Sequence, residues 1–112
     1  MLPTPYAEQV LDLVARIPKG RVMTYGDIAG VVGGSALSVG NVMSRYGSGV
    51  PWWRVIRAGG LLPPGHEVEA GKRLTAEGAP FREPLVRIDL DRGRWSPLRA
   101  AEVSAPAGSL SP

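Results

Sequence analysis

The sequence contains no cysteine and a single histidine among its 112 residues. Without cysteine the chain has no disulfide, no thiolate metal ligand and no thiol nucleophile. With His66 as the sole imidazole, a zinc site or a Ser-His-Asp triad is also poorly supplied. We therefore expect a protein that holds no metal and no other cofactor.

Long hydrophobic runs are missing as well. The first ten residues, MLPTPYAEQV, lack the charged start and the apolar stretch of a signal peptide. No segment reaches the roughly 18 consecutive apolar residues that a membrane helix requires. The expected location is therefore the cytoplasm, with no membrane contact, and a chain of 112 residues with 44% hydrophobic residues supports one small domain.

The charge balance is basic. Lys and Arg total 13 and Asp and Glu total 10, which gives a formal net charge of +3 and a pI near 9.8. This balance favours a polyanionic partner but does not identify one, because many small basic proteins bind no nucleic acid.

Two helices are predicted near the N-terminus. Thr4 suits an N-cap, and apolar residues then recur at helical spacing over residues 5–17. Thr24 and Asp27 resemble a capping box that opens a second, short helix ending at about residue 32, where a pair of glycines follows.

A third helix is predicted for the segment ALSVGNVMSRY, with Ser35 as its N-cap. At 100° per residue its two sides differ. One side carries Val39, Val42, Met43 and Tyr46, and the other carries Leu37, Gly40, Asn41 and Ser44. Two short helices joined by a glycine turn are typical of a helix-turn-helix, in which this helix would be the recognition helix. Its small outer residues suit either a nucleic-acid groove or a neighbouring helix.

The segment WRVIRAGGLL alternates well enough for a β-hairpin. Residues 53–57 and 61–62 would pair around a turn at residues 58–60, and after a helix-turn-helix this hairpin would act as a wing. The fold class predicted is thus mainly α with a small β-hairpin, a winged helix-turn-helix-like single domain over residues 4–95.

The second half of the chain is less patterned. A fourth helix is expected over residues 67–77, on a thin apolar stripe of Val68, Ala70 and Leu74. A short extended piece, PLVRIDL, and a turn or helix at DRGRW follow. Residues 96–112 are rich in Ser, Pro and Ala, which predicts a disordered tail.

The segment PWWRV resembles the active-site segment Pro-Cys-His-Arg-Val of the O6-alkylguanine-DNA alkyltransferases. Trp52 stands in the place of the cysteine and Trp53 in the place of the histidine. In the same order, IPKGRVMTYGDIA is similar to the family's strand and first motif helix, SVGNVM to its recognition helix, and TAEG to a later helix end. The resemblance covers the family's C-terminal DNA-binding domain. Because self-alkylation needs a thiolate, the chain is most similar to the non-catalytic alkyltransferase-like proteins, and we expect no enzyme activity.

The resemblance also implies a binding mode. The recognition helix would enter the minor groove, and the damaged nucleotide would be swung out of the stack into a pocket beneath PWWRV. Tyr25 matches the tyrosine that contacts the flipped base and the adjoining phosphate, and the backbone carbonyls of Trp52 and Val55 match acceptors for the guanine edge. The implied lesion pocket comprises Tyr25, Trp52, Trp53, Arg54 and Val55. The implied DNA contacts are Thr24, Tyr25, Ala36, Leu37, Gly40, Asn41, Ser44 and Arg45.

Several residues carry a second interpretation. For Trp53, structural packing is the better one, and Arg54 either holds a phosphate or ties neighbouring carbonyls together. Glu77 matches the carboxylate that orients the family's histidine, and with that histidine gone we expect a capping or surface group. His66 is expected to be a solvated or capping residue. Leu37 occupies the position of the family's intercalating arginine and would hold the gap by volume alone, which predicts weaker base flipping.

The functional hypothesis is non-enzymatic binding of O6-alkylguanine lesions in duplex DNA, which flags them for nucleotide excision repair. It implies a nucleoid-associated monomer with nucleotide excision repair proteins as further partners. The alternative is a winged-helix transcription regulator without lesion specificity, although the third helix offers few long polar side chains for reading a major groove. An enzyme of another kind or a protein-interaction module agrees less well with the shortage of acid-base groups and with the basic pI.

Overall fold

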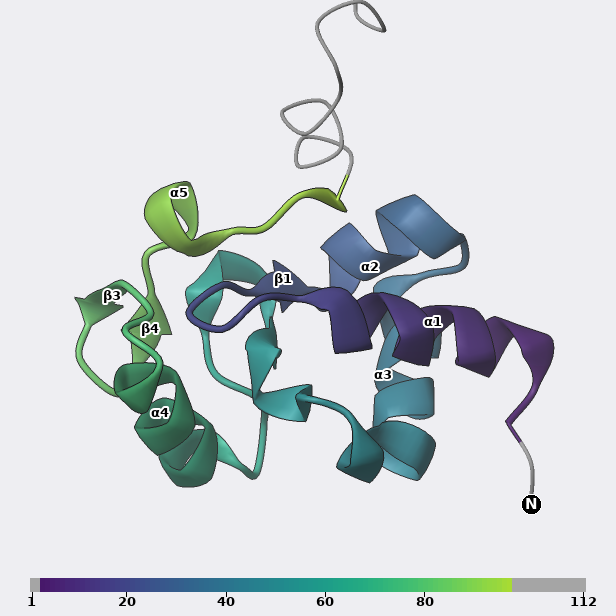
Figure 1. Ribbon diagram of the computed structural model, residues 1–112, viewed down its shortest axis with the longest axis horizontal. Coiled ribbons are helices and arrows are strands. Elements are labelled where there is room, and N and C mark those ends of the chain that lie inside the picture. Colours follow the sequence, from purple (N-terminus) through teal and green to yellow (C-terminus); the bar gives the residue numbers. More distant parts are fainter. Residues whose placement is uncertain (1–2, 98–112) are drawn as a thin grey trace, which may run out of the picture.

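The computed structural model describes residues 3–97, and the predicted tail lies outside them from residue 98 onward. In chain order the helices and strands are α1 (Pro5–Arg16), β1 (Met23–Thr24), α2 (Tyr25–Val32), α3 (Ala36–Tyr46), β2 (Val55–Ile56), α4 (Glu67–Ala76), β3 (Phe81–Glu83), β4 (Arg87–Ile88) and α5 (Leu90–Gly93). Short 3₁₀ helices lie between them: η1 (Gly47–Gly49), η2 (Trp52–Arg54) and η3 (Ala58–Gly60). The mainly α class with short strand pairs is the one predicted (Figure 1).

The predicted N-caps of the first three helices are confirmed. The Thr4 hydroxyl accepts a hydrogen bond from the Ala7 amide at the start of α1. The capping box of Thr24 and Asp27 opens α2, with both reciprocal bonds at 3.0 Å. A second capping box opens α3, where Ser35 caps the helix. These bonds satisfy amides that the first helical turn leaves without partners, so the sequence sets where each helix begins.

The turn between α2 and α3 is tied to α1. Gly33 and Gly34 both have positive φ, at 96° and 79°, a conformation that favours glycine. The Tyr6 hydroxyl from α1 donates to the Gly33 carbonyl at 2.9 Å and lies 3.0 Å from the Ser38 hydroxyl. A β-carbon on Gly34 would overlap the Tyr6 hydroxyl. The first turn of α3 is therefore fixed against α1.

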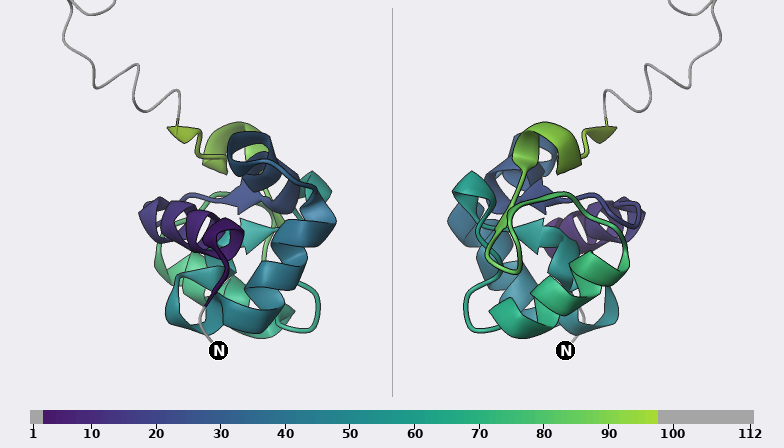
Figure 2. Two further views of the ribbon diagram at one scale, coloured as in Figure 1. Left: turned by 90° about the vertical axis from the view of Figure 1, so that its right-hand side faces the viewer. Right: turned by 90° about the vertical axis from the view of Figure 1, so that its left-hand side faces the viewer.

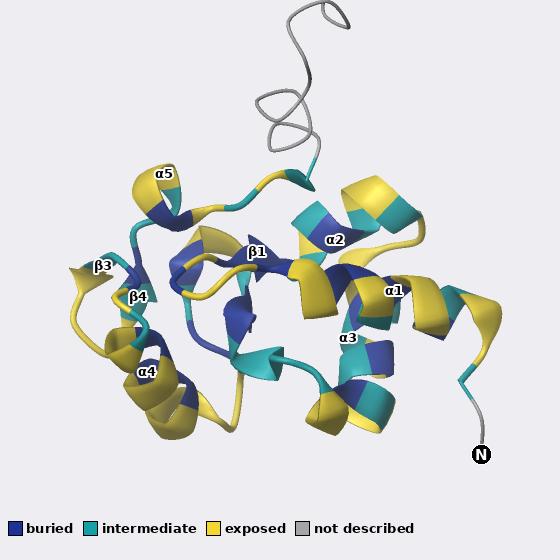
Figure 3. Cartoon of the chain, in the orientation of Figure 1, coloured by how far each residue is buried: buried dark blue, intermediate teal, exposed yellow. Residues whose placement is uncertain are grey.

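The strands β1 and β2 separate two apolar clusters. They pair in parallel, with Met23 opposite Val55. Because neighbouring strand residues face opposite ways, Met23 and Val55 join the cluster beneath α1, α2 and α3, whereas Val22 and Ile56 join the cluster beneath α4 and β4. Figures 1 and 3 show this strand pair at the buried centre, with α1 to α3 on one side and α4, β3 and β4 on the other.

The hairpin predicted over residues 53–62 is wrong. Residues 52–54 form the 3₁₀ helix η2, and β2 pairs with β1 rather than with residues 61–62. A turn does form at η3, where the Arg57 amide donates to the Leu61 carbonyl at 2.8 Å. The antiparallel hairpin of the described chain is instead β3 with β4. The alternation of apolar and polar residues in this segment predicts extended backbone correctly at β2, but it does not predict which strand β2 pairs with.

The helix α4 confirms the fourth predicted helix, but its apolar stripe differs. Ala70 and Leu74 are buried, whereas Val68 is 72% exposed and is not part of the core. Gly71 is buried instead, because Leu62 and Leu85 pack where its side chain would be. The predicted extended piece PLVRIDL is a strand only at β4, and the predicted turn or helix at DRGRW is α5.

The end of the described chain returns to the first half of the fold. The Trp95 amide donates to the Val22 carbonyl, and the Arg94 guanidinium pairs with Asp27 at 3.0 Å. The two side views agree that α5 and α2 lie at the same edge of the molecule, opposite the end at which α3 finishes (Figure 2). Within residues 3–97, no helix combines the length and apolar character that crossing a membrane requires.

The close contact between η3 and β4 predicts a large cost for one substitution. Gly60 has φ 91°, and a β-carbon there would overlap the Ile88 carbonyl oxygen. We expect Gly60→Ala to lower the free energy of unfolding by about 3 kcal/mol, measured by urea denaturation. The matched control is Gly65→Ala, because Gly65 has φ 81° with open space around it. That change should cost about 1 kcal/mol, and equal losses would contradict the overlap.

Candidate nucleic-acid interface

A cavity of about 730 Å³ lies beside the outer side of α3. From α3 it is lined by Ala36, Leu37, Gly40, Asn41, Met43 and Ser44. The remaining lining residues are Tyr25, Gly47, Ser48, Trp52, Pro63, Pro64 and His66. The cavity therefore joins the predicted recognition helix to one of the adjacent tryptophans.

Trp52 stands at the wall of this cavity and is half-buried. Its ring centroid lies 5.8 Å from that of Trp53, with the ring planes at 88°, and 5.4 Å from that of His66. The edge-to-face arrangement is a favourable one for aromatic pairs. Its indole N–H has no hydrogen-bond partner within residues 3–97, so it is available to a ligand.

Tyr25, the first residue of α2, also lines the cavity. Burial raises the pKa of its hydroxyl above the ordinary value, and the nearby Arg57 charge opposes this only in part. The hydroxyl is therefore protonated at neutral pH and can donate a hydrogen bond. Nothing in the described part of the chain accepts that bond, which leaves Tyr25 a free donor at the cavity wall.

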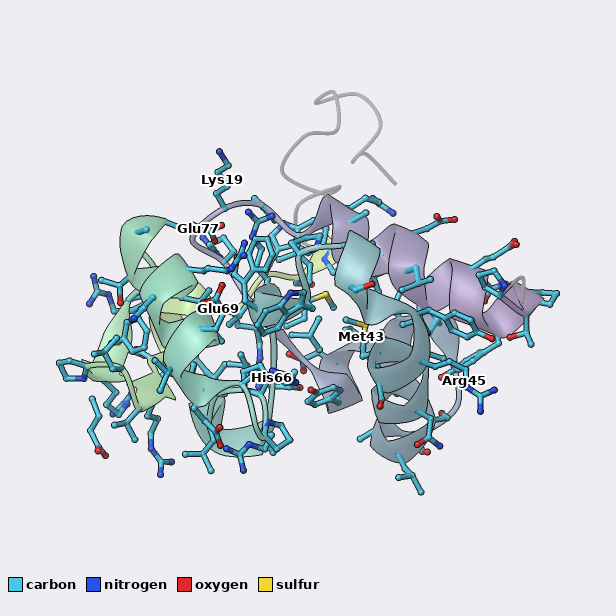
Figure 4. All side chains as sticks on the ribbon, turned by 90° about the horizontal axis from the view of Figure 1, so that it is seen from below. Lys19, Met43, Arg45, His66, Glu69 and Glu77 are labelled. Atoms are coloured by element: carbon cyan, nitrogen blue, oxygen red, sulfur yellow. The ribbon has the colours of Figure 1, made fainter. Side chains whose placement is uncertain are left out.

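The two sides of α3 are divided nearly as the sequence predicts. Val39 and Val42 are buried in the core, and all four predicted outer residues line the cavity. Leu37 is 75% exposed at the cavity edge. The helical period places Met43 on the core side, but it also lines the cavity, because it is half-buried at the boundary between the two sides. Arg45 does not line the cavity and lies on the opposite side of α3 from Met43 (Figure 4).

The carboxylate of Glu77 is the polar centre behind the cavity wall. It accepts hydrogen bonds from the Trp53 indole at 3.0 Å, from the Gly20 amide at 3.1 Å, and from the Arg54 Nε at 3.1 Å. The Arg54 Nη2 donates a further hydrogen bond to Glu77 at 2.6 Å. In this ion pair the Arg54 side chain is 10% exposed and the Glu77 side chain is 11% exposed. Glu77 is the C-cap residue of α4 through its backbone amide, as one part of the expectation has it, but the expectation of a surface carboxylate is wrong.

The charge state of Glu77 follows from these contacts. Burial alone would raise the pKa of its carboxyl. The hydrogen bonds from Arg54, Gly20 and Trp53, together with the Arg54 charge, outweigh burial and hold the pKa below its ordinary value. Glu77 is thus ionised and paired at neutral pH.

The other implied pocket residues lie behind the wall rather than in its lining. Trp53 is held by Glu77 and packs against two guanidinium groups, with Arg73 4.5 Å and Arg54 5.2 Å from its ring centroid. Arg54 is buried and donates to the Ile17 carbonyl at 2.9 Å, which is the second of its two interpretations. Val55 is in the core, and Thr24 is buried as the cap of α2. Their side chains do not line the cavity.

Sequence reasoning missed the part of the lining that follows η3. Pro63, Pro64 and His66 lie about ten residues after Trp52 in a loop without periodicity, so no local pattern places them beside it. His66 is exposed at the N-cap of α4 but makes no side-chain capping bond. Figure 4 shows His66 and Met43 facing the space between α4 and α3. Within residues 3–97, no three His, Asp or Glu side chains gather in a way that could hold a metal ion.

Comparison with known proteins identifies relatives over most of the chain. Residues 5–79 match the profile of the 6-O-methylguanine DNA methyltransferase, DNA binding domain. A DNA base-flipping protein of Vibrio parahaemolyticus is 37% identical over 95 residues, covering 80% of this chain and 94% of that protein. The DNA base-flipping protein of Escherichia coli is 38% identical over 97 residues, covering 81% of this chain and 74% of that protein.

A solved structure is similar over its whole length. It is that of the Schizosaccharomyces pombe alkyltransferase-like protein in complex with damaged DNA containing O6-carboxymethylguanine. The TM-score is 0.72 at 31% identity, and the match covers 87% of this chain and 100% of the other.

The buried pair predicts a stability loss for Glu77→Gln. The amide cannot neutralise Arg54, which would remain buried without a counter-charge, so we expect the free energy of unfolding at pH 7 to fall by about 3 kcal/mol. The matched control is Glu69→Gln, because Glu69 pairs with Arg73 at the surface and is 54% exposed. The control should change stability by less than about 1 kcal/mol in the same urea titration.

The same variant also predicts a change in acid sensitivity. Because the pKa of Glu77 is lower in the folded than in the unfolded state, its contribution is fully present above the unfolded pKa and is lost as pH falls through the folded pKa. Stability of the parent should therefore decline below about pH 4.5, and Glu77→Gln should decline less steeply. If the free energy of unfolding of parent and variant falls equally steeply below this pH, the lowered pKa of Glu77 is contradicted.

Proposed function

The chain belongs to the 6-O-methylguanine DNA methyltransferase family through its DNA-binding domain, and on this basis we propose that it binds O6-alkylguanine in duplex DNA without transferring the alkyl group. The lesion would be turned out of the duplex into the cavity beside Trp52. The relatives named above as base-flipping proteins, and the relative bound to damaged DNA, support this proposal.

One observation carries the proposal. Trp52, which stands in the place of the family's cysteine, lines the same cavity as the outer side of α3. An indole is a poor nucleophile but a good stacking surface, and base–aromatic stacking contributes about 1 to 3 kcal/mol. The position that holds the reactive sulfur in the enzymes would here hold the alkylated base by contact alone.

The outer side of α3 suits the minor groove. Gly40 and Ser44 are small, and a groove about 6 Å wide admits a helix only where its side chains are short. Leu37 lies on the same side of α3 and is 75% exposed. An exposed apolar side chain at this place could insert between base steps, as wedge residues of minor-groove proteins do. Apolar wedges keep a gap open by volume but offer no hydrogen bonds to the orphaned partner base.

The two unpaired donors at the wall suit a flipped nucleotide. The Tyr25 hydroxyl is neutral and free to donate to a phosphate or a base acceptor. The Trp52 indole N–H also has no partner in the described part of the chain. Backbone carbonyls of residues 52 and 55 would accept from the guanine edge, by resemblance to the family.

Binding without turnover gives the protein a signalling role. A lesion that is held but not repaired must be removed by other proteins, and we infer that nucleotide excision repair proteins are the partners. The expected form is a monomer associated with the nucleoid. A transcription regulator without lesion preference is the alternative, and the short side chains on α3 disfavour it.

Lesion preference is expected to depend on Trp52 and Tyr25. Binding of duplexes that differ by one O6-methylguanine should be measured by fluorescence anisotropy over a range of salt. We expect Trp52→Ala to reduce the preference for the modified duplex roughly tenfold, and Tyr25→Phe to reduce it about threefold through loss of the hydroxyl. The salt dependence, which phosphate contacts set, should be unchanged for Trp52→Ala.

The control for these variants is Val31→Ala. Val31 is 46% exposed on α2 and does not line the cavity, so its truncation should leave the preference unchanged. Equal affinity of the parent for modified and unmodified duplexes would leave only non-specific binding and would support the alternative function.

Restoring an arginine at the wedge is expected to strengthen binding. We predict that Leu37→Arg tightens binding to the modified duplex about fivefold, because a guanidinium adds hydrogen bonds to the orphaned base. Val68→Arg is the control, since Val68 is 72% exposed on α4, outside the cavity lining, and receives the same charge. Equal gains for both variants would show a general charge effect and would contradict the placement of α3.

A further inference from the structure

The lining of the cavity includes a single histidine, His66. The lining contains no Lys, Arg, Asp or Glu, and the ionisable members are Tyr25 and His66. Tyr25 stays neutral because burial raises the pKa of its hydroxyl. Histidine is the residue whose charge ordinarily changes between about pH 5 and pH 8. Among the lining residues, His66 is therefore the one that can offer a positive charge to a ligand, and the nearest further cation is Arg57, which acts on Tyr25 from outside the lining and is paired with Glu67.

His66 is placed to act on the same group that Trp52 contacts. Its ring centroid lies 5.4 Å from that of Trp52, with the ring planes at 60°, and the side chain is exposed at the cavity rim. The imidazole makes no hydrogen bond or ion pair within residues 3–97, whereas its backbone amide is already bonded to the Pro63 carbonyl. A substituent that lies along the Trp52 ring toward this rim comes within reach of the imidazole.

Most charged groups on the elements around His66 are paired with one another, and Lys72 of α4, which is exposed, lies outside the cavity lining. The pairs are Glu67 with Arg57, Glu69 with Arg73, and Arg54 with Glu77. On the facing helix α3, Arg45 lies on the side away from the cavity (Figure 4). None of these groups lines the cavity, so none competes with His66 for a bound anion at the wall.

A carboxylate at this exposed rim keeps part of its hydration, and a cationic donor beside it adds a charge-assisted hydrogen bond. We propose that His66 determines adduct specificity by favouring guanine adducts that end in a carboxylate, and that this preference grows as the pH falls. The inference rests on the proposed function, since it takes this cavity as the lesion site. Protonated imidazole would donate a charge-assisted hydrogen bond to the adduct, whereas neutral methyl adducts gain nothing from it.

The test compares two adducts in the same duplex. Affinities for O6-carboxymethylguanine, O6-methylguanine and unmodified guanine should be measured from about pH 8 to about pH 5.5, where the carboxylate stays ionised. The ratio of the carboxymethyl to the methyl affinity cancels effects of pH on backbone contacts. For the parent we expect this ratio to rise about fivefold as the pH falls.

Two variants and a control assign the effect. In His66→Gln the ratio should stay flat and low, and in His66→Lys it should stay high at every pH, because the charge is then permanent. Lys72→Gln is the control, since it removes a positive charge from an exposed residue of α4 outside the cavity lining. The control should keep the full rise with falling pH.

The outcomes separate the two proposals. A preference for O6-methylguanine over guanine, combined with a ratio that ignores pH or survives in His66→Gln, overturns the role of His66 and leaves the proposed function standing. No preference for either adduct over guanine overturns the proposed function and this inference with it. Unchanged circular dichroism and thermal midpoints of the His66 variants, whose side chain is exposed, would confirm that folding is not the cause.

Discussion

The ionised carboxylate of Glu77 is the interaction on which the cavity wall depends. Its partners come from the loop after α1 and from η2, while Glu77 itself follows the last residue of α4. One buried group thus joins three segments that are distant in the sequence. Removing a carboxylate from water is costly, and here four donated hydrogen bonds offset that cost. Through Trp53 and Arg54 these bonds tie η2, which carries Trp52 at the cavity wall, to the end of α4.

The adjacent tryptophans have different tasks because of this centre. Trp53 donates its N–H to Glu77 and lies against two guanidinium groups, so it is fully committed to the protein. Trp52 packs edge to face on it, and its own N–H has no partner among the residues that the structure describes. In the family pattern the position of Trp53 is a histidine, which both donates and accepts a proton. Indole only donates. Trp53 thus donates a hydrogen bond to the carboxylate, as the resemblance implies for the histidine, but it offers no atom that could accept a proton.

The features that the sequence predicts correctly depend on interactions between residues that are close together in the chain. The caps at Thr4, Thr24 and Ser35 depend on residues three positions away, and the structure forms each of them. The outer side of α3 follows from helical period, and it lines the cavity as expected. These features need no knowledge of the tertiary fold.

What the sequence did not predict depends on distant contacts. Val55 and Ile56 are extended as expected, yet their partner is β1, about thirty residues earlier, so the hairpin was placed wrongly. For Glu77 the sequence predicts a capping or surface group, because the histidine that the resemblance implies as its partner is missing, and only the fold reveals the bonds from Trp53 and Arg54. The place of His66 beside Trp52 depends on the path of a proline loop, which no period describes.

The outer wall of the cavity belongs to neither apolar cluster. Pro64 and His66 line it and are exposed, whereas the nearest core residue, Leu62, is 1% exposed and ends the buried part of that segment with Pro63. Substitutions at the rim alter the outline of the cavity and leave core packing unchanged. The outline of this outer wall is thus set by residues that carry little of the interior packing, whereas Tyr25 and Met43 on the inner wall serve both the core and the cavity.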